Sequence, residues 1–252
     1  MSKRGRRGAQ GPGPERAREV ARQKLAEQRA AQRRRTAAIV AAVVAAVLLV
    51  SAGVGIAIYN AQTKSPAHTA IPKGATAAGI VVGKPDAKVT VDVYLDFLCP
   101  VCKQFEDATG PTLARYVAAG TAKIDYHPVA FLDRLSAGTR YSTRAAAAAG
   151  CAADAGVFPK YLQLLYAHQP REGSPGLTAA ELVALGRQAG ATSSSFADCV
   201  EQKRYQDWVA GVTDLASKAG VNATPTVLVN GTRLPAPTTA AVTAAVEAAA
   251  KK

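Results

Sequence analysis

Two cysteines three positions apart, Cys99 and Cys102, are the residues of this sequence best suited to redox chemistry. The stretch before them, Val89–Leu95, alternates β-branched and polar residues like a strand, and residues 103–119 have the composition of a helix. At the start of a helix, positions i and i+3 share one face, so the two thiols can approach to disulfide distance. The helix N-terminus also stabilises a thiolate, so we expect the pKa of Cys99 to fall from about 8.5 into a range of about 3.5–7.5.

The two residues between the thiols, Pro100 and Val101, are expected to tune the site. Pro100 suits the first helical position because proline has no N–H to leave unpaired. A zinc knuckle is the alternative for a Cys-x-x-Cys, but zinc prefers four ligands and no second close pair of Cys or His exists in the sequence. We therefore expect neither a metal nor a cofactor, and we interpret the three histidines as linker, strand-end and helix residues (His68, His127, His168).

Basic residues are concentrated at the N-terminus. Of the formal net charge of +13, residues 1–35 carry +9, from twelve Lys and Arg against three Glu. Because no aromatic or base-reading element accompanies this tail, we do not expect it to bind nucleic acid. We expect a partly disordered cytoplasmic tail at residues 1–35, which either contacts anionic lipid headgroups or serves only as a solvated topology signal.

An uncharged apolar segment follows the tail at residues 36–59. Its 22 residues Ala37–Ile58 would span about 33 Å as a helix, enough for a bilayer core of about 30 Å. The arginines at 33–35 place the N-terminus in the cytoplasm and the rest of the chain outside. A cleaved signal peptide would have a shorter basic start and a shorter apolar core. A buried core helix is disfavoured because every face of this segment is apolar. We predict a single transmembrane helix that anchors the protein in the cell membrane.

The remaining chain predicts a linker at 60–78 and an extracytoplasmic α/β domain at 79–252. Within one of the expected helices, Thr178 and Glu181 have the spacing of a capping box. The elements expected after the first helix are, in order, a strand at 123–132, a block of helices within about 136–220, a strand at 226–229, a hairpin turn at Asn230–Gly231 and a helix at 238–250.

This order of elements, with Cys99-Pro100-Val101-Cys102 on the first helix and Thr224-Pro225 before a late strand, resembles the DsbA family of thioredoxin-fold disulfide oxidoreductases. The membrane-tethered members found in actinobacteria are especially similar, and the resemblance covers about residues 78–250. It implies a thioredoxin fold with an inserted helical block, a cis Pro225 beside the disulfide, and a Thr224 whose backbone pairs with substrate. Thioredoxin-like proteins often place an acid six residues before the first cysteine. Here that residue is Val93, and we interpret Asp96 as a local polar residue rather than a catalytic base.

Two further cysteines, Cys151 and Cys199, lie 48 residues apart in the expected helical block. Four cysteines allow three pairings. Proximity pairs Cys99 with Cys102, which leaves Cys151 with Cys199. Outside the membrane a structural disulfide is expected, and a second redox-active or regulatory pair is the alternative.

Taken together, these features predict a membrane-anchored thiol:disulfide oxidoreductase that oxidises reduced or misoxidised extracytoplasmic proteins. By analogy with the family, a VKOR-like or DsbB-like membrane protein would reoxidise it. A reductase or isomerase is the alternative among enzymes. A redox-inert peptide-binding module is the alternative from another class, and the intact pair of thiols argues against it.

Overall fold

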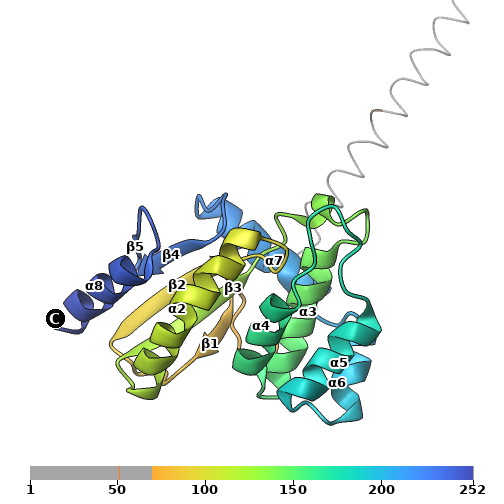
Figure 1. Ribbon diagram of the computed structural model, residues 1–252, viewed down its shortest axis with the longest axis horizontal. Helices are drawn as coiled ribbons and strands as arrows, with labels where there is room; N and C mark the ends of the chain where they lie inside the picture. Colours follow the sequence, from red (N-terminus) through yellow and green to blue (C-terminus); the bar gives the residue numbers. More distant parts are fainter. Residues whose placement is uncertain (1–50, 52–69, 252) are drawn as a thin grey trace, which may run out of the picture. The chain divides into compact units, whose positions relative to one another are not determined.

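The computed structural model describes Ser51 and residues 70–251. The predicted tail, the predicted transmembrane helix apart from Ser51, and residues 60–69 of the predicted linker lie outside this part. No helix among the described residues is long and apolar enough to cross a membrane. The strands are β1 (Ile80–Val82), β2 (Val89–Leu95), β3 (Ala122–Pro128), β4 (Thr226–Val229) and β5 (Thr232–Arg233). The helices are α2 (Pro100–Ala118), α3 (Tyr141–Asp154), α4 (Phe158–Ala167), α5 (Ala179–Ala189), α6 (Ser194–Glu201), α7 (Gln206–Lys218) and α8 (Thr239–Ala250), with a 3₁₀ turn η1 (Asp133–Leu135) (Figure 1).

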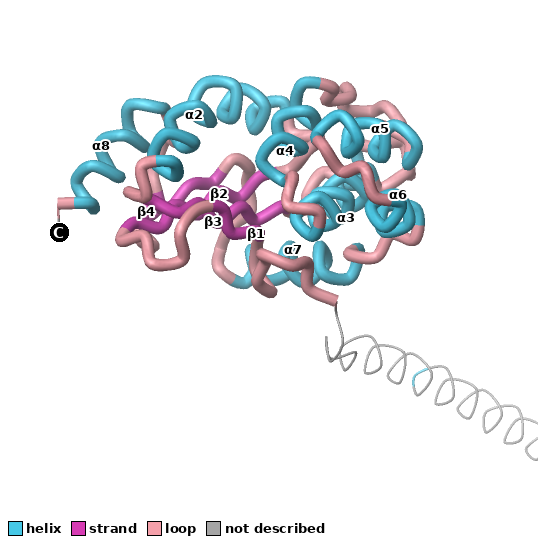
Figure 2. Tube along the Cα trace, turned by 90° about the horizontal axis from the view of Figure 1, so that it is seen from below, coloured by secondary structure: helices cyan, strands magenta, loops and turns pink. Residues whose placement is uncertain are grey.

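The strands form one sheet in the order β1-β3-β2-β4-β5. Strands β2 and β3 are parallel and joined through α2, and the other neighbours are antiparallel. Helices α2 and α8 lie on one face of the sheet and α7 lies on the other (Figure 2). The core between the sheet and helices α2 and α8 is made of buried aliphatic and aromatic side chains: Val91, Val93, Phe105, Leu113, Ile124, Val242 and Val246.

The alternating sequence of β2 explains why this strand is central. Its odd-numbered residues are all buried, from Val89 to Leu95, whereas Thr90, Asp92 and Tyr94 on the opposite face are partly exposed. A strand with one apolar face has only one register that buries that face, so its position in the sheet is strongly specified.

Helices α3 to α7 lie between β3 and β4 in the sequence. Helices α3 to α6 gather beside the sheet, whereas α7 packs against β3 (Figure 1). This arrangement confirms the predicted thioredoxin fold with an inserted helical block. The alanine-rich α3 packs against α4, α6 and α7. Its small side chains allow this close approach, since eleven of its fourteen residues are buried. The predicted capping box at Thr178 and Glu181 is also present, at the start of α5.

The prediction that the second long strand extends to residue 132 is wrong, because β3 ends at Pro128. Beyond this proline, the N–H of Val129 still donates to the carbonyl of Leu95 at 2.9 Å, but later N–H groups donate to side chains of other segments. The N–H of Ala130 donates to Thr213 Oγ1 at 3.1 Å, and the N–H of Leu132 donates to Asp96 Oδ2 at 2.9 Å. The chain therefore leaves the sheet beside the end of β2, next to the cysteine pair.

Candidate active site

The cysteine pair lies where the chain leaves β2 and enters α2. Cys99 is the N-cap residue of α2, with an extended backbone, and Pro100 occupies the first turn as predicted. The N–H of Cys99 donates to the carbonyl of Asp96 at 3.0 Å, and the carbonyl of Cys99 accepts from the N–H of Lys103 at 3.3 Å. The Cys99 sulfur therefore sits at the positive end of the helix dipole.

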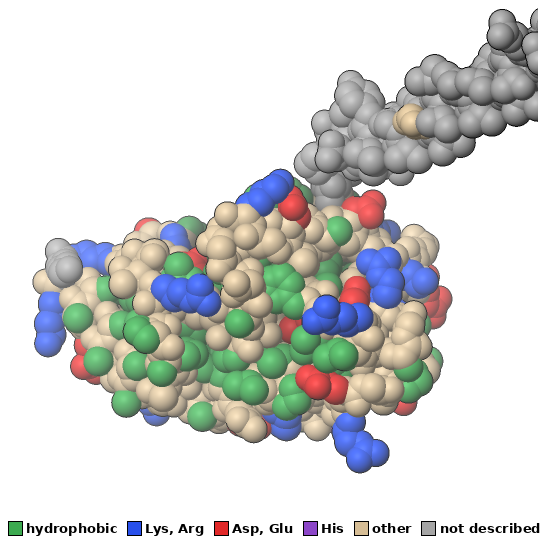
Figure 3. Space-filling view, turned by 90° about the horizontal axis from the view of Figure 1, so that it is seen from above, with side chains coloured by type: hydrophobic (Ala, Val, Ile, Leu, Met, Phe, Trp, Pro, Cys, Tyr) green, Lys and Arg blue, Asp and Glu red, His purple; other side chains and the backbone are tan. Residues whose placement is uncertain are grey.

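Both thiols are largely enclosed. Cys102 is fully buried and Cys99 is 6% exposed, so Cys99 is the more accessible of the two sulfurs. The exposed residues of the motif are Pro100 and Val101, the latter at 54%. Seen from the side at which α2 begins, hydrophobic side chains gather across the middle of the molecular surface (Figure 3). Only a small part of the Cys99 side chain is accessible to a thiol from outside.

The pKa values of the two thiols are shifted in opposite directions. The pKa of Cys99 falls to about 6, and the largest cause is a hydrogen bond from Cys102. Hydrogen bonds from Thr224 and from the N–H groups of Val101 and Cys102 lower this pKa further, whereas partial burial raises it. Burial and the neighbouring Cys99 sulfur instead raise the pKa of Cys102 far above its ordinary range. At neutral pH, the reduced site therefore holds a Cys99 thiolate and a Cys102 thiol. The predicted pKa range of Cys99 agrees with this geometry.

The second predicted element of the site lies against the first. The Thr224–Pro225 peptide bond is cis, as the family resemblance implied, and it precedes β4. The sulfur of Cys99 lies 3.5 Å from the carbonyl oxygen of Thr224, although the two residues are 125 positions apart. The fold thus brings together four predicted site residues from two segments: Cys99, Cys102, Thr224 and Pro225.

Asp96, which we interpreted as a local polar residue, is fully buried next to the loop that carries Cys99. Its Oδ1 accepts hydrogen bonds from the Leu98 N–H at 2.9 Å and from Ser142 Oγ at 2.7 Å, while its Oδ2 accepts from the Leu132 N–H. Burial raises the pKa of Asp96 to about 6 against the effect of these bonds, and the charge of Cys99 raises it further. Asp96 lies one residue past the end of β2, so the alternation of that strand does not determine the surroundings of its side chain.

We predict that Asp96→Asn lowers the pKa of Cys99. The charge of Cys99 raises the pKa of Asp96, and interaction between two sites is mutual, so the carboxylate must oppose the thiolate. Titration of the thiolate absorbance in the reduced protein measures the effect. Asp107→Asn is the control, because this acid lies on α2, the helix that carries Cys102, but is exposed and paired with Lys103. A higher Cys99 pKa in Asp96→Asn would show that Asp96 acts through the loop geometry instead.

Side chains from the helical block hold the loop that carries Cys99. Gln169 Nε2 donates to the carbonyl oxygens of Phe97 and Cys99 at 3.0 and 2.9 Å, and Tyr166 Oη donates to the carbonyl of Asp96 at 3.3 Å. The sequence analysis did not identify Gln169, Tyr166 or Ser142. No local pattern marks them, since their partners lie about 45 to 70 positions away in the chain.

Cys151 and Cys199 are joined by a disulfide, whereas Cys99 and Cys102 are free thiols. The bond links α3 to α6, and both half-cystines are almost completely buried. Neither residue is part of the cluster around Cys99. This placement agrees with the structural disulfide that the sequence predicted.

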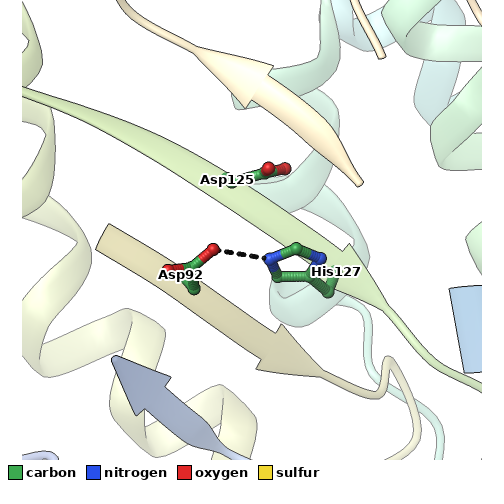
Figure 4. Close-up of side chains that lie close together, drawn as sticks. All are labelled: Asp92, Asp125 and His127. Carbon is green, nitrogen blue, oxygen red and sulfur yellow. Dashed lines mark hydrogen bonds and ion pairs between the residues drawn. The ribbon is translucent and has the colours of Figure 1, made fainter. Parts of the chain in front are cut away.

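A second cluster of ionisable groups, Asp92, Asp125 and His127, lies on β2 and β3 (Figure 4). Its residue Asp92 is on the face of β2 opposite the buried odd-numbered residues. Such side chains can bind divalent metals, and their ligand atoms lie within 4.8 Å of one another. His127 is only 4% exposed, and both ring nitrogens have partners. Nδ1 lies 2.8 Å from the carbonyl of Ala78, which can only accept, and Nε2 lies 3.0 Å from Asp92 Oδ1. Both nitrogens therefore donate when the ring is an imidazolium, which ties the segment before β1 to the sheet.

We predict that this imidazolium stabilises the fold in a pH-dependent way. Burial alone would lower the pKa of His127, but Asp92, Asp125 and the Ala78 carbonyl raise it above its ordinary value of about 6.5. The contribution is therefore complete below about pH 6.5 and is lost as the pH rises through the folded-state pKa. Urea unfolding of wild type and His127→Gln, both with Cys99 and Cys102 oxidised, should show a stability difference that shrinks between pH 5.5 and 8.5. A difference that stays constant would exclude a charged His127.

Two curated relatives are much longer than the part of them that this chain matches. The match to the Na⁺/H⁺ antiporter NhaA 3 of Salinispora tropica is 33% identical and covers 61% of this chain but 22% of that protein. The match to the serine/threonine-protein kinase PknE of Mycobacterium tuberculosis is 29% identical and covers 59% of this chain and 29% of the kinase. This chain thus matches less than a third of the length of either protein.

Solved structures match over most of their length. Oxidised DsbA of M. tuberculosis is 35% identical, with 69% of this chain and 93% of that chain covered and a TM-score of 0.61. The reduced disulfide oxidoreductase DsbG of the same organism is 36% identical, with 71% and 86% covered and a TM-score of 0.59. BdbD of Bacillus subtilis, 23% identical, shares the fold over 73% of this chain and 98% of its own, with a TM-score of 0.62. The thioredoxin family profile matches residues 75–248, and the chain therefore belongs to the thioredoxin family, in its DsbA-like form.

Proposed function

We propose that this protein is a membrane-anchored thiol:disulfide oxidoreductase that oxidises cysteine pairs in secreted and surface proteins. The observation that carries the proposal is the acidic Cys99 thiol, with a pKa of about 6, at the start of α2 and beside cis-Pro225. A stable Cys99 thiolate favours the reduced form of the pair, and a pair that is stable when reduced is a strong oxidant.

The oxidation would proceed in two exchanges. A substrate thiolate attacks Sγ of Cys99 in the oxidised pair, the Cys99–Cys102 bond breaks, and Cys102, whose pKa is raised, takes up a proton. A second thiolate of the same substrate then attacks the substrate sulfur of the mixed disulfide and releases Cys99 as a thiolate. The substrate loses two electrons, and these remain on the reduced pair.

Several residues support these steps. The Thr224 carbonyl beside the Cys99 sulfur marks where the substrate backbone would lie, and the exposed Val101 offers an apolar contact. Reoxidation needs an acceptor for two electrons, for which we propose a VKOR-like or DsbB-like membrane protein.

The reduction potential of the Cys99/Cys102 pair tests the proposed direction. Equilibration of the oxidised protein with glutathione should give a potential closer to the value of about −120 mV typical of a strong oxidant than to the value of about −270 mV of thioredoxin. A potential near the lower value would favour a reductase or isomerase. If Cys99 and Cys102 form no disulfide at all, only the peptide-binding module is left.

The proposed anchoring predicts the topology of the chain. The excess of Lys and Arg lies before the apolar segment, so residues from Asn60 onward should be extracytoplasmic. Alkaline phosphatase fused after Lys64 should be active, whereas a fusion after Ser2 should be inactive. The reverse pattern would contradict the proposed orientation, and release of the Lys64 fusion into the medium would indicate cleavage.

A further inference from the structure

A groove of about 420 Å³ lies between α2 and α4, bounded by β1 and β3. Helices α2 and α4 contact each other, and Figure 1 shows them side by side. The wall of the groove is mostly apolar, with side chains that include Val82, Ala114, Val117, Ile124, Leu162 and Tyr166. Neither cysteine of the active site lines it. An apolar hollow of this size is typical of a small-molecule site when a few polar groups converge on it.

Glu106 supplies such a polar group. Its side chain is partly exposed as a whole, but its Oε1 is enclosed and has no hydrogen-bond partner among the residues that the structure describes. Gly110, one turn further along α2, leaves the space for this carboxyl group, because a Cβ there would lie 2.9 Å from Glu106 Oε2. An enclosed polar atom without a partner costs about 1–3 kcal/mol, so a ligand that donates to it would recover this energy.

A second acceptor lies on the same helix. Pro111 has no N–H, so the carbonyl of Asp107 lacks the donor that residue 111 would otherwise supply. Both Asp107 and Pro111 line the groove. The lining residues include two acids, Glu106 and Asp107, and no Lys, Arg or His, although Asp107 pairs with Lys103 outside the groove at 2.9 Å. The groove therefore combines an apolar wall with two acidic residues and one enclosed carboxyl oxygen that has no partner among the described residues.

We propose that this groove binds a small amphiphilic cation, an alkyl- or arylalkylammonium whose apolar part fills the hollow and whose N–H groups donate to Glu106. An ammonium group has three donors and no acceptor, so it matches a surface of this kind. A carboxylate or phosphate ligand would meet two like charges, and a fully apolar ligand would leave Glu106 Oε1 unpaired.

The protonation state of Glu106 should make binding of the cation depend on pH. Burial, with a contribution from Asp107, raises the pKa of Glu106 to about 8, so its carboxyl group is mostly protonated at neutral pH. The other titratable groups that face it are Tyr126 and Tyr166, whose pKa values are raised well above 10, so they stay neutral. An ammonium ion stabilises the carboxylate and displaces its proton. Binding should therefore tighten as the pH rises through about 8.

The experiment compares 2-phenylethylamine with its uncharged analogue 2-phenylethanol. Each is titrated into the oxidised protein and followed by NMR, so that the thiols do not titrate. We expect saturable shifts of α2 and α4 resonances with the amine, a Kd at least about tenfold lower at pH 9 than at pH 6.5, and much weaker binding of the alcohol. Equal binding of amine and alcohol, or no saturation by the amine, would overturn the proposal.

Three variants locate the site. Glu106→Gln keeps the shape but removes the charge, so it should abolish the pH dependence and weaken binding of the amine about tenfold or more. Asp214→Asn is the control, because this exposed acid on α7 pairs with Lys218 and does not line the groove, and it should retain the pH dependence. Ala114→Leu places bulk in the groove from an exposed position on α2 and should weaken binding of both compounds while Glu106 stays in place. Unchanged amine binding in Glu106→Gln, or in Ala114→Leu if the first variant fails to fold, would contradict the proposal.

Discussion

Cys99→Ser should abolish both oxidation and reduction of disulfides, with a loss of activity on the order of a thousandfold or more. Cys99 is the accessible sulfur of the pair, and its thiolate is stabilised by Cys102, by Thr224 and by the start of α2. A serine hydroxyl cannot form the mixed disulfide. Turnover of a peptide with two cysteines, followed by loss of its free thiols, measures the effect.

Cys102→Ser should give a different result. Cys99 remains reactive, but the neighbouring thiol that releases it is gone, so mixed disulfides with extracytoplasmic proteins should accumulate and be visible on non-reducing gels. Cys99→Ser is the matched control and should accumulate none. Equal trapping by both variants would mean that Cys102 can also be attacked, which its complete burial argues against.

Removal of the Cys151–Cys199 disulfide should destabilise the domain by about 4 kcal/mol, because the bond closes a loop of 48 residues in the unfolded chain. The substitution Cys151→Ala with Cys199→Ala leaves small apolar residues in a well-packed site. Urea unfolding in a background of Cys99→Ser and Cys102→Ser avoids exchange between thiols. The same background with Cys151 and Cys199 intact is the reference.

The two disulfides should also differ in their resistance to reductant. The Cys99–Cys102 bond should open first, because Cys99 is accessible and its low pKa makes it a good leaving group, whereas Cys151 and Cys199 are enclosed between helices. Peptide mapping after mild reduction separates the two bonds. Simultaneous opening would instead support a second redox-active pair at Cys151 and Cys199.

The sequence predicted those features of the site that depend on neighbouring residues. Alternation defined β2, the spacing of Cys99 and Cys102 defined the start of α2, and Thr178 with Glu181 defined a helix start. Each signal lies within a few residues of the structure that it specifies. The pairing of Cys151 with Cys199 followed because four cysteines leave few combinations.

The features that were missed depend on contacts between distant segments. Asp96 is buried because Ser142 and the Leu132 N–H, both more than thirty residues away, satisfy its carboxylate. Cys99 is enclosed because the Thr224 segment folds against it. A single sequence carries no marker for such partners, since the same residue types occur as ordinary surface residues elsewhere.

The clamp formed by Gln169 and Tyr166 has a consequence for how the redox motif can change. These two side chains bond only to backbone carbonyls, those of Asp96, Phe97 and Cys99, and every residue type carries a carbonyl. The shape of the loop is thus held independently of the side chains at its accessible positions. Pro100 and Val101 can therefore be exchanged, and the acidity of Cys99 retuned, without redesign of the helical block. In evolutionary terms, one part of the protein, the clamp, sets the geometry of the loop, and another part, Pro100 and Val101, sets the reduction potential of the cysteine pair.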